Sequence, residues 1–365
     1  MVTKDDIGTV ELKSVGEYNM SNWHITQMID TLTIVNNKFD ILYRINGLLN
    51  NGVNKRNIFI TDKSFLITTN YKTYFEKGNE IKNEDHSLVK ATYIGRYITL
   101  EKNEEIININ VLFSYYKSIS SLINRSLKCK LHRMYLHESY EILFEFGLKV
   151  ACERLTEAAK QQVQEVYSRH LTLDNKKQQA LLAGIDKESQ KIVRLEAKYR
   201  KQGNESIEEF VRLFNSLDRP VIGIYDEKRH SFEIINYDQI YKNGEESPNR
   251  IQLKSVSKNS PVVFGLLITG VMLSVIGYLV YRDHQVNNED IEENMLNMPS
   301  SSVDAIRNVY RNANGSPAEN EIKEGEKQVD EKVLALAESN FNKLEQILNK
   351  RKIEISIKTE VNVKI

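Results

Sequence analysis

The sequence predicts an α+β cytosolic domain with a long helical hairpin, then one transmembrane helix, then a small α+β distal domain ending in a strand. Three observations predict this class. Residues 261–281 form an uncharged apolar run, which as a helix is long enough to cross a bilayer. Residues 139–217 show helical spacing over a length well above the globular average. Residues 353–365 alternate apolar and polar side chains, the period of a half-buried strand.

Charge is balanced over the whole chain. The 365 residues contain 50 Lys and Arg and 50 Asp and Glu, so no global basic charge attracts nucleic acid and we expect no nucleic-acid partner. The two cysteines, Cys129 and Cys152, both precede the apolar run. The predicted distal part therefore has no disulfide framework to support it.

The predicted cytosolic domain covers residues 1–240. Apolar residues recur at helical spacing in 21–50, whereas β-branched and aromatic runs separated by polar turns predict a small antiparallel sheet in 55–110. Pro220 ends the helical region, and residues 221–237 predict a β-hairpin.

The helical region 139–217 predicts two long helices joined by a short break. Ser139 suits the N-cap of the first helix. In the second, apolar residues follow four-three spacing: Leu181, Ile185, Ile192, Leu195 and Tyr199, with Glu188 in the seam. This pattern predicts an antiparallel helical hairpin, either packed on the domain or projecting as a stalk. We expect Ile185, Ile192 and Leu195 to dock a cytosolic partner.

The flanks of the apolar run predict its orientation. Residues 241–260, a juxtamembrane linker, carry several lysines, whereas residues 282–300 form an acidic linker. Because positive charge stays on the cytoplasmic side, the N-terminus is expected in the cytoplasm and the C-terminus outside, in the periplasm if the cell is Gram-negative. A buried helix in a large soluble core is the alternative to a membrane span.

A stripe of small residues lies on one face of the predicted transmembrane helix. It consists of Gly270, Ser274 and Gly277, and such a stripe lets another helix approach closely within the lipid bilayer. Glycine is also common in single spans that do not associate, so both outcomes stay open.

The distal domain, residues 301–365, combines helices with the terminal strand. The apolar residues of that strand are Ile353, Ile355, Ile357, Val361, Val363 and Ile365. The distal segment offers no second strand of similar strength, yet the backbone groups of a strand need a neighbour. The pattern predicts strand addition to another copy or another protein, and a local hairpin is the alternative.

Sequence motifs for catalysis are missing. The sequence contains no Gly-rich phosphate loop, no strand-linked GxGxxG, and no GxSxG, HExxH or paired CxxC motif. The spacing of His132 and His137 suits neither one helix face nor one strand face, and Cys152 is most simply a small core residue. We predict no catalytic residue, no metal and no cofactor.

These features favour a non-enzymatic structural or assembly subunit of a multiprotein membrane-spanning complex. Such a subunit binds other proteins on both sides of the bilayer as a homo- or hetero-oligomer. The layout resembles that of bitopic platform proteins of bacterial pilus and secretion machines. The alternatives are a phage or viral membrane protein and a transmembrane signalling receptor, although no kinase, cyclase or helix-turn-helix signature accompanies the run.

Overall fold

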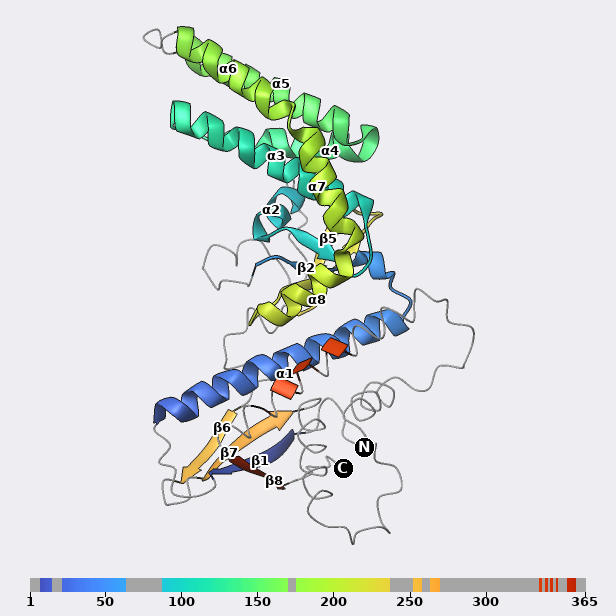
Figure 1. The fold of residues 1–365 in the computed structure, drawn as a ribbon, viewed down its shortest axis with the longest axis vertical. Helices are drawn as coiled ribbons and strands as arrows, with labels where there is room; N and C mark the ends of the chain where they lie inside the picture. Colours follow the sequence, from blue (N-terminus) through green and yellow to red (C-terminus); the bar gives the residue numbers. More distant parts are fainter. Residues whose placement is uncertain are drawn as a thin grey trace. The chain divides into compact units, whose positions relative to one another are not determined.

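The computed structural model divides the chain into two compact units (Figure 1). Unit 1 comprises Met1–Val53 and Asn236–Ile365, and unit 2 comprises Asn54–Ile235. The residues that the structure describes are 7–14, 22–63, 87–169, 175–236, 252–257, 263–269, parts of 335–346, and 353–358.

Unit 1 contains a four-stranded antiparallel sheet with the strand order β6-β7-β1-β8. The strands are β1 (Ile7–Ser14), β6 (Gln252–Ser257), β7 (Val263–Thr269) and β8 (Ile353–Lys358). Val10 of β1 lies opposite Leu266 of β7 and Ile357 of β8. Segments from both ends of the chain therefore meet in one sheet, with β7 and β1 as its inner strands.

The long helix of unit 1 is α1 (Asn22–Asn50). Its buried apolar side chains include Met28, Leu32, Val35, Phe39 and Leu42. Steps of three and four residues place these side chains on one face, and burial of that face stabilises the helix.

The predicted transmembrane helix is wrong. Val263–Thr269, which lies within the apolar run, forms β7 and pairs with β1 on one edge and β6 on the other. Among the described residues, no helix has the length and apolar character that a bilayer crossing requires. The predicted fold class and the single-pass membrane location are therefore wrong as well.

The physical reason is that the apolar run shows no alternation of apolar and polar residues, so no two-residue period marks it as a strand. An inner strand with apolar residues on both faces reads as a continuous apolar run, which hydropathy alone does not distinguish from a helix. The predicted juxtamembrane linker likewise contains a strand, β6, which pairs with β7. The small residues Gly270, Ser274 and Gly277 lie outside the described residues.

Unit 2 contains a second antiparallel sheet, with the strand order β3-β2-β4-β5. Its strands are β2 (Ile58–Thr61), β3 (Tyr97–Thr99), β4 (Ile222–Asp226) and β5 (Ser231–Ile234). The 3-10 helix η1 (Lys55–Asn57) precedes β2. The β4–β5 hairpin completes a sheet whose other strands lie far earlier in the chain.

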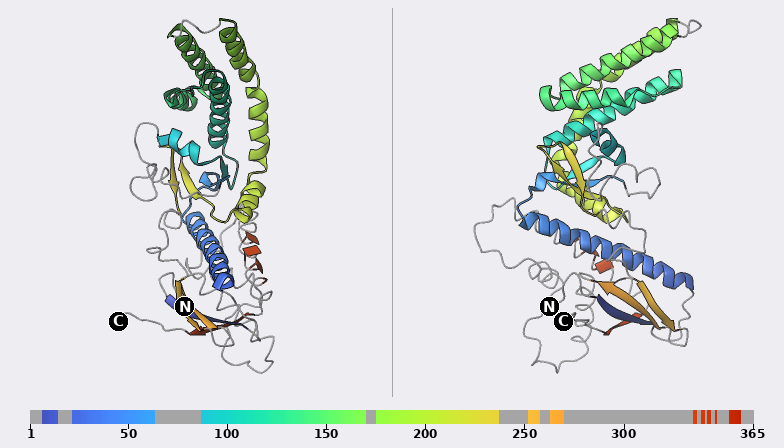
Figure 2. Two further views of the ribbon diagram at one scale, coloured as in Figure 1. Left: turned by 90° about the vertical axis from the view of Figure 1, so that its left-hand side faces the viewer. Right: turned by 180° about the vertical axis from the view of Figure 1, so that it is seen from behind.

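Helices make up most of unit 2. They are α2 (Ser87–Ile94), α3 (Glu104–Leu127), α4 (Arg133–Phe146), α5 (Leu148–Arg169), α6 (Asn175–Ser189), α7 (Ile192–Asn204) and α8 (Ser206–Ser216). Both views of Figure 2 show α3, α5 and α6 side by side, and each of the three contacts the other two. The described part of the chain is thus mostly helical, with two small antiparallel sheets.

The predicted long hairpin is divided into shorter helices. Gly147 adopts a φ of 86° and separates α4 from α5, because glycine tolerates this left-handed conformation. Further breaks fall between α6 and α7 and at Glu205. Ser139 is not a cap: it is buried within α4, and its hydroxyl donates to the Tyr135 carbonyl oxygen at 2.6 Å.

Gly223 in β4 has no room for a side chain. A Cβ atom at this position would overlap the Glu233 carbonyl oxygen and the Phe59 ring. We expect Gly223→Ala to lower the free energy of unfolding by about 1–3 kcal/mol, the usual cost of overpacking, as measured by chemical denaturation. The matched control is Gly184→Ala in α6.

At Gly184 the nearest atom to an added Cβ is the terminal Cδ2 of Leu122, at 3.2 Å. That methyl group can move, and alanine favours the helix, so this variant should stay within about 1 kcal/mol of the wild type. Equal destabilisation of the two variants would contradict the packing described for β4.

Candidate anion-binding groove

The turn between α3 and α4 builds the candidate site. α3 ends at Lys128, whose φ of 55° is left-handed and whose amide donates to the Asn124 carbonyl oxygen at 3.0 Å. The chain then runs to His132, the N-cap residue of α4. This short connection brings the end of one helix against the start of the next.

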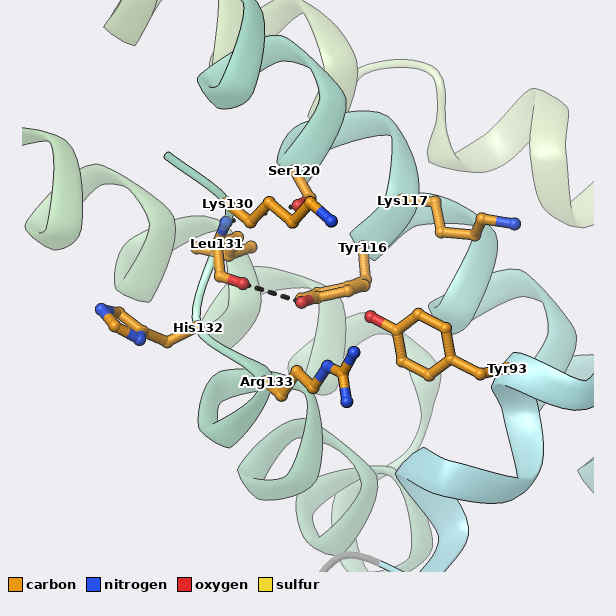
Figure 3. Close-up of a pocket in the computed structure, with 8 residues that line it drawn as sticks. All are labelled: Tyr93, Tyr116, Lys117, Ser120, Lys130, Leu131, His132 and Arg133. Atoms are coloured by element: carbon orange, nitrogen blue, oxygen red, sulfur yellow. Dashed lines mark hydrogen bonds between the residues drawn. The ribbon is translucent and has the colours of Figure 1, made fainter. Parts of the chain in front are cut away.

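A cavity of about 380 Å³ opens beside this turn (Figure 3). Its lining residues come from α2, α3, the turn and the first residue of α4: Tyr93, Tyr116, Lys117, Ser120, Lys130, Leu131, His132 and Arg133. The cavity therefore has the size of a small ligand site.

The floor of the groove is rigid and uncharged. The Tyr116 hydroxyl donates to the Leu131 carbonyl oxygen at 2.8 Å (Figure 3), and the Leu131 amide donates to the Ser120 hydroxyl oxygen at 3.3 Å. Burial, together with a hydrogen bond to the Tyr93 side chain, raises the pKa of Tyr116. The phenol of Tyr116 therefore stays protonated at neutral pH.

Gln162 of α5 holds the turn from behind. Its side-chain oxygen accepts from the His132 amide at 3.0 Å, and its side-chain nitrogen donates to the Lys130 carbonyl oxygen at 3.0 Å. Gln162 is buried, and a buried amide with both ends bonded fixes the backbone of the turn.

Three cationic residues are among those that line the groove: Lys117, Lys130 and Arg133. All three are exposed, and no acidic residue lines the cavity. Within the part of the chain that the structure describes, none of the three forms an ion pair. The Arg133 guanidinium lies 4.6 Å from the centre of the Tyr93 ring, a cation–π contact that leaves its charge uncompensated.

The start of α4 adds to this positive field. The first turn of α4 contains no acidic residue, and the N-cap residue His132 makes no side-chain capping bond. The first amide groups of the helix thus retain their partial positive charge beside the cations. The arrangement favours a negatively charged group in the groove.

A sequence signal for this site exists, although charge totals conceal it. Residues 106–137 contain no Asp or Glu. The Lys and Arg residues of this stretch, called the basic stretch below, are Lys117, Arg125, Lys128, Lys130 and Arg133. A local charge count along the chain would have found it, whereas Tyr93 comes from α2 and only the fold places it beside α3.

None of the residues predicted from the sequence to form sites lines the groove. Ile185 is 0% exposed and belongs to the core of unit 2, whereas Ile192 and Leu195 of α7 are half-buried. Ile353, Ile355 and Ile357 lie in β8, which pairs with β1 of the same chain. Val361, Val363 and Ile365 lie outside the described residues.

The seam residue Glu188 is satisfied within unit 2. It accepts a hydrogen bond from the Ser118 hydroxyl at 2.6 Å and pairs with Lys191 at 2.6 Å. The hydrogen bond from Lys191, followed by that from Ser118, lowers the pKa of Glu188. The Glu188 carboxylate in the predicted seam is thus stabilised by the Ser118 hydroxyl and the Lys191 ammonium group.

A second polar cluster joins the sheet of unit 2 to α3. The His230 Nδ1 atom lies 2.5 Å from Glu105 Oε1, and the Tyr225 hydroxyl donates to the same oxygen at 2.7 Å. The His230 ring stacks on Phe144 with a centroid distance of 3.7 Å. These contacts anchor the β4–β5 turn.

The chain shows no match to a protein-family model, to a curated protein or to a solved structure. Among the described residues, no three His, Cys, Asp or Glu side chains come together in a way that would hold a metal ion. The groove is therefore interpreted from its own geometry and charge.

The cysteines offer a test of the packing of α5. Burial raises the pKa of Cys152 to about 12, so its thiol stays protonated and unreactive at mildly alkaline pH. Cys129, in the turn after α3, is half-buried. We expect an aromatic disulfide reagent to label one thiol in the native protein and two after denaturation.

The control is Cys129→Ser, which should show no rapid native labelling because Cys152 is buried. Absorbance of the released thiolate measures both reactions. Rapid labelling of this variant under native conditions would show that Cys152 is accessible and that the α5 packing is wrong.

Proposed function

We propose that unit 2 is a binding module that holds an anionic group in the groove between α2, α3 and α4. The observation that carries the proposal is that Lys117, Lys130 and Arg133 all line a cavity to which no acidic side chain contributes. A charge pair at 4 Å gives about 1 kcal/mol in water and about 4 kcal/mol at the effective dielectric near a protein surface. Three unpaired cations therefore supply enough attraction for binding.

The chemistry of the groove supports binding rather than a reaction. The Tyr116 hydroxyl donates its proton to the Leu131 carbonyl oxygen. A catalytic nucleophile needs an adjacent base that activates it. The protein is accordingly proposed to be a non-enzymatic binding subunit of a larger assembly.

Titration with tripolyphosphate tests the groove. We expect saturable binding by isothermal titration calorimetry, and Lys130→Gln and Arg133→Gln should each weaken it roughly tenfold, because a hydrogen bond to a charged group contributes about 1.5–3 kcal/mol. Both side chains are exposed, so neither substitution should alter the fold.

The matched control is Lys149→Gln, which removes an exposed lysine of α5 that does not line the groove. This variant should bind tripolyphosphate as the wild type does. Equal losses in all three variants would indicate nonspecific attraction to net charge, and absence of binding by the wild type would refute the proposal.

A second proposal concerns assembly through β8. The strand order β6-β7-β1-β8 gives β8 one partner, β1, and leaves its other edge without a strand among the described residues. A strand edge that has no β partner can act as a template for strand addition. We propose that this edge pairs with a second copy of the chain.

Two neighbouring proline substitutions test this edge. Amide groups alternate in direction along an antiparallel strand. The substitutions Ile355→Pro and Ser356→Pro therefore differ in effect. One of them removes an amide group that is bonded to β1, and the other removes an amide group that faces outward. The outward variant should keep the melting temperature of the wild type and lose self-association by sedimentation. If that variant folds normally and still self-associates, β8 does not mediate assembly.

A further inference from the structure

The positive charge of the groove continues beyond its rim. The basic stretch adds Arg125 and Lys128, both exposed, toward the end of α3. Within the described residues, no member of the stretch forms an ion pair with a carboxylate. Glu188, whose pKa Arg125 helps to lower, is already paired with Lys191. Exposed cations without an ion-pair partner therefore continue along the chain from the groove to the end of α3.

The donors of the groove can hold an anionic group, but they do not enclose it. Sites for small phosphorylated molecules enclose the ligand and place a few polar groups precisely around it. Here Lys117, Lys130 and Arg133 are exposed, and the Tyr116 proton is used by the Leu131 carbonyl group. Exposed cations spread over a surface attract a row of charges instead, largely by releasing counterions.

Planar groups at the rim of the groove distinguish between kinds of polyanion. His132 and Arg133 are exposed at the start of α4, and the Arg133 guanidinium already lies over the Tyr93 ring. Nucleobases stack on imidazole and guanidinium planes, whereas the side chains of an acidic peptide offer no such surface. Stacking requires bases that are free of a complementary strand.

We infer that the groove and the adjoining basic stretch bind a single-stranded nucleic acid, with phosphates along Lys117, Lys130 and Lys128 and a base against Arg133. The inference rests on the proposed anion-binding function of unit 2. It replaces the expectation from total charge, because the equal numbers of acidic and basic residues hide a local excess of cations.

Fluorescence anisotropy with a labelled single strand of about twelve nucleotides tests the inference in the full chain. The single strand should bind at least roughly tenfold more tightly than a duplex of the same sequence. The logarithm of its affinity should fall with the logarithm of salt concentration with a slope of about −0.7 for each phosphate contacted. Three to five contacts thus give a slope between about −2 and −3.5.

Lys128→Gln separates the inference from the proposed function, because Lys128 lies outside the groove lining. This variant should weaken oligonucleotide binding and reduce the salt slope by about 0.7, while its tripolyphosphate affinity stays at the wild-type value. Lys149→Gln should change neither ligand. Circular dichroism and melting temperature verify that each variant is folded.

The outcomes are distinct. If tripolyphosphate binds but the oligonucleotide binds no more tightly than tripolyphosphate does, the inference fails and the anion-binding function stands. If a duplex or a poly-glutamate chain competes as well as the single strand, the assignment to single-stranded nucleic acid is wrong. If neither tripolyphosphate nor the oligonucleotide binds, both proposals fail.

Discussion

The anchoring of α3 to the sheet is the constraint on which unit 2 depends. Asn103 accepts hydrogen bonds from the amides of Glu105 and Ile106 and so caps the helix, while its side-chain nitrogen donates to the Arg56 carbonyl oxygen. About two helical turns further on, Asn110 binds both the amide and the carbonyl group of Tyr97 in β3, at 3.1 and 2.7 Å. Both asparagines are buried, so loss of either would leave buried backbone groups without partners.

The groove follows from this anchoring. Tyr116, Lys117 and Ser120 lie on the same helix, within three turns of Asn110. The bonds to the sheet therefore fix the position of these residues along the axis of α3 and their orientation around it. The other wall belongs to the turn that Gln162 and Tyr116 hold by three hydrogen bonds. Buried amides and a buried phenol position the walls, which leaves the lysines and Arg133 at the surface for a ligand.

Sequence periodicity predicted the parts of the fold that local pattern determines. Helical spacing marked α1 and the region of α4 to α8, and the alternation from Ile353 predicted a strand where β8 lies. It did not reveal that β8 pairs with β1, because strand pairing across the whole chain has no local signature. The apolar run of β7 was misinterpreted for a related reason: an inner strand and a membrane helix share the same hydropathy.

The candidate site was likewise missed because the prediction used the total charge and not its distribution along the chain. In unit 2 the acidic residues near α3 are already paired, as Glu104 is with Arg200 and Glu227 with Arg56. The cations of the basic stretch form no ion pair among the described residues, and an excess of one sign of charge destabilises a compact state through self-repulsion. Under the proposed function, an anion in the groove would offset this charge, and a ligand that binds only the folded state stabilises that state. The local imbalance that total charge concealed thus links the proposed ligand binding to the stability of unit 2.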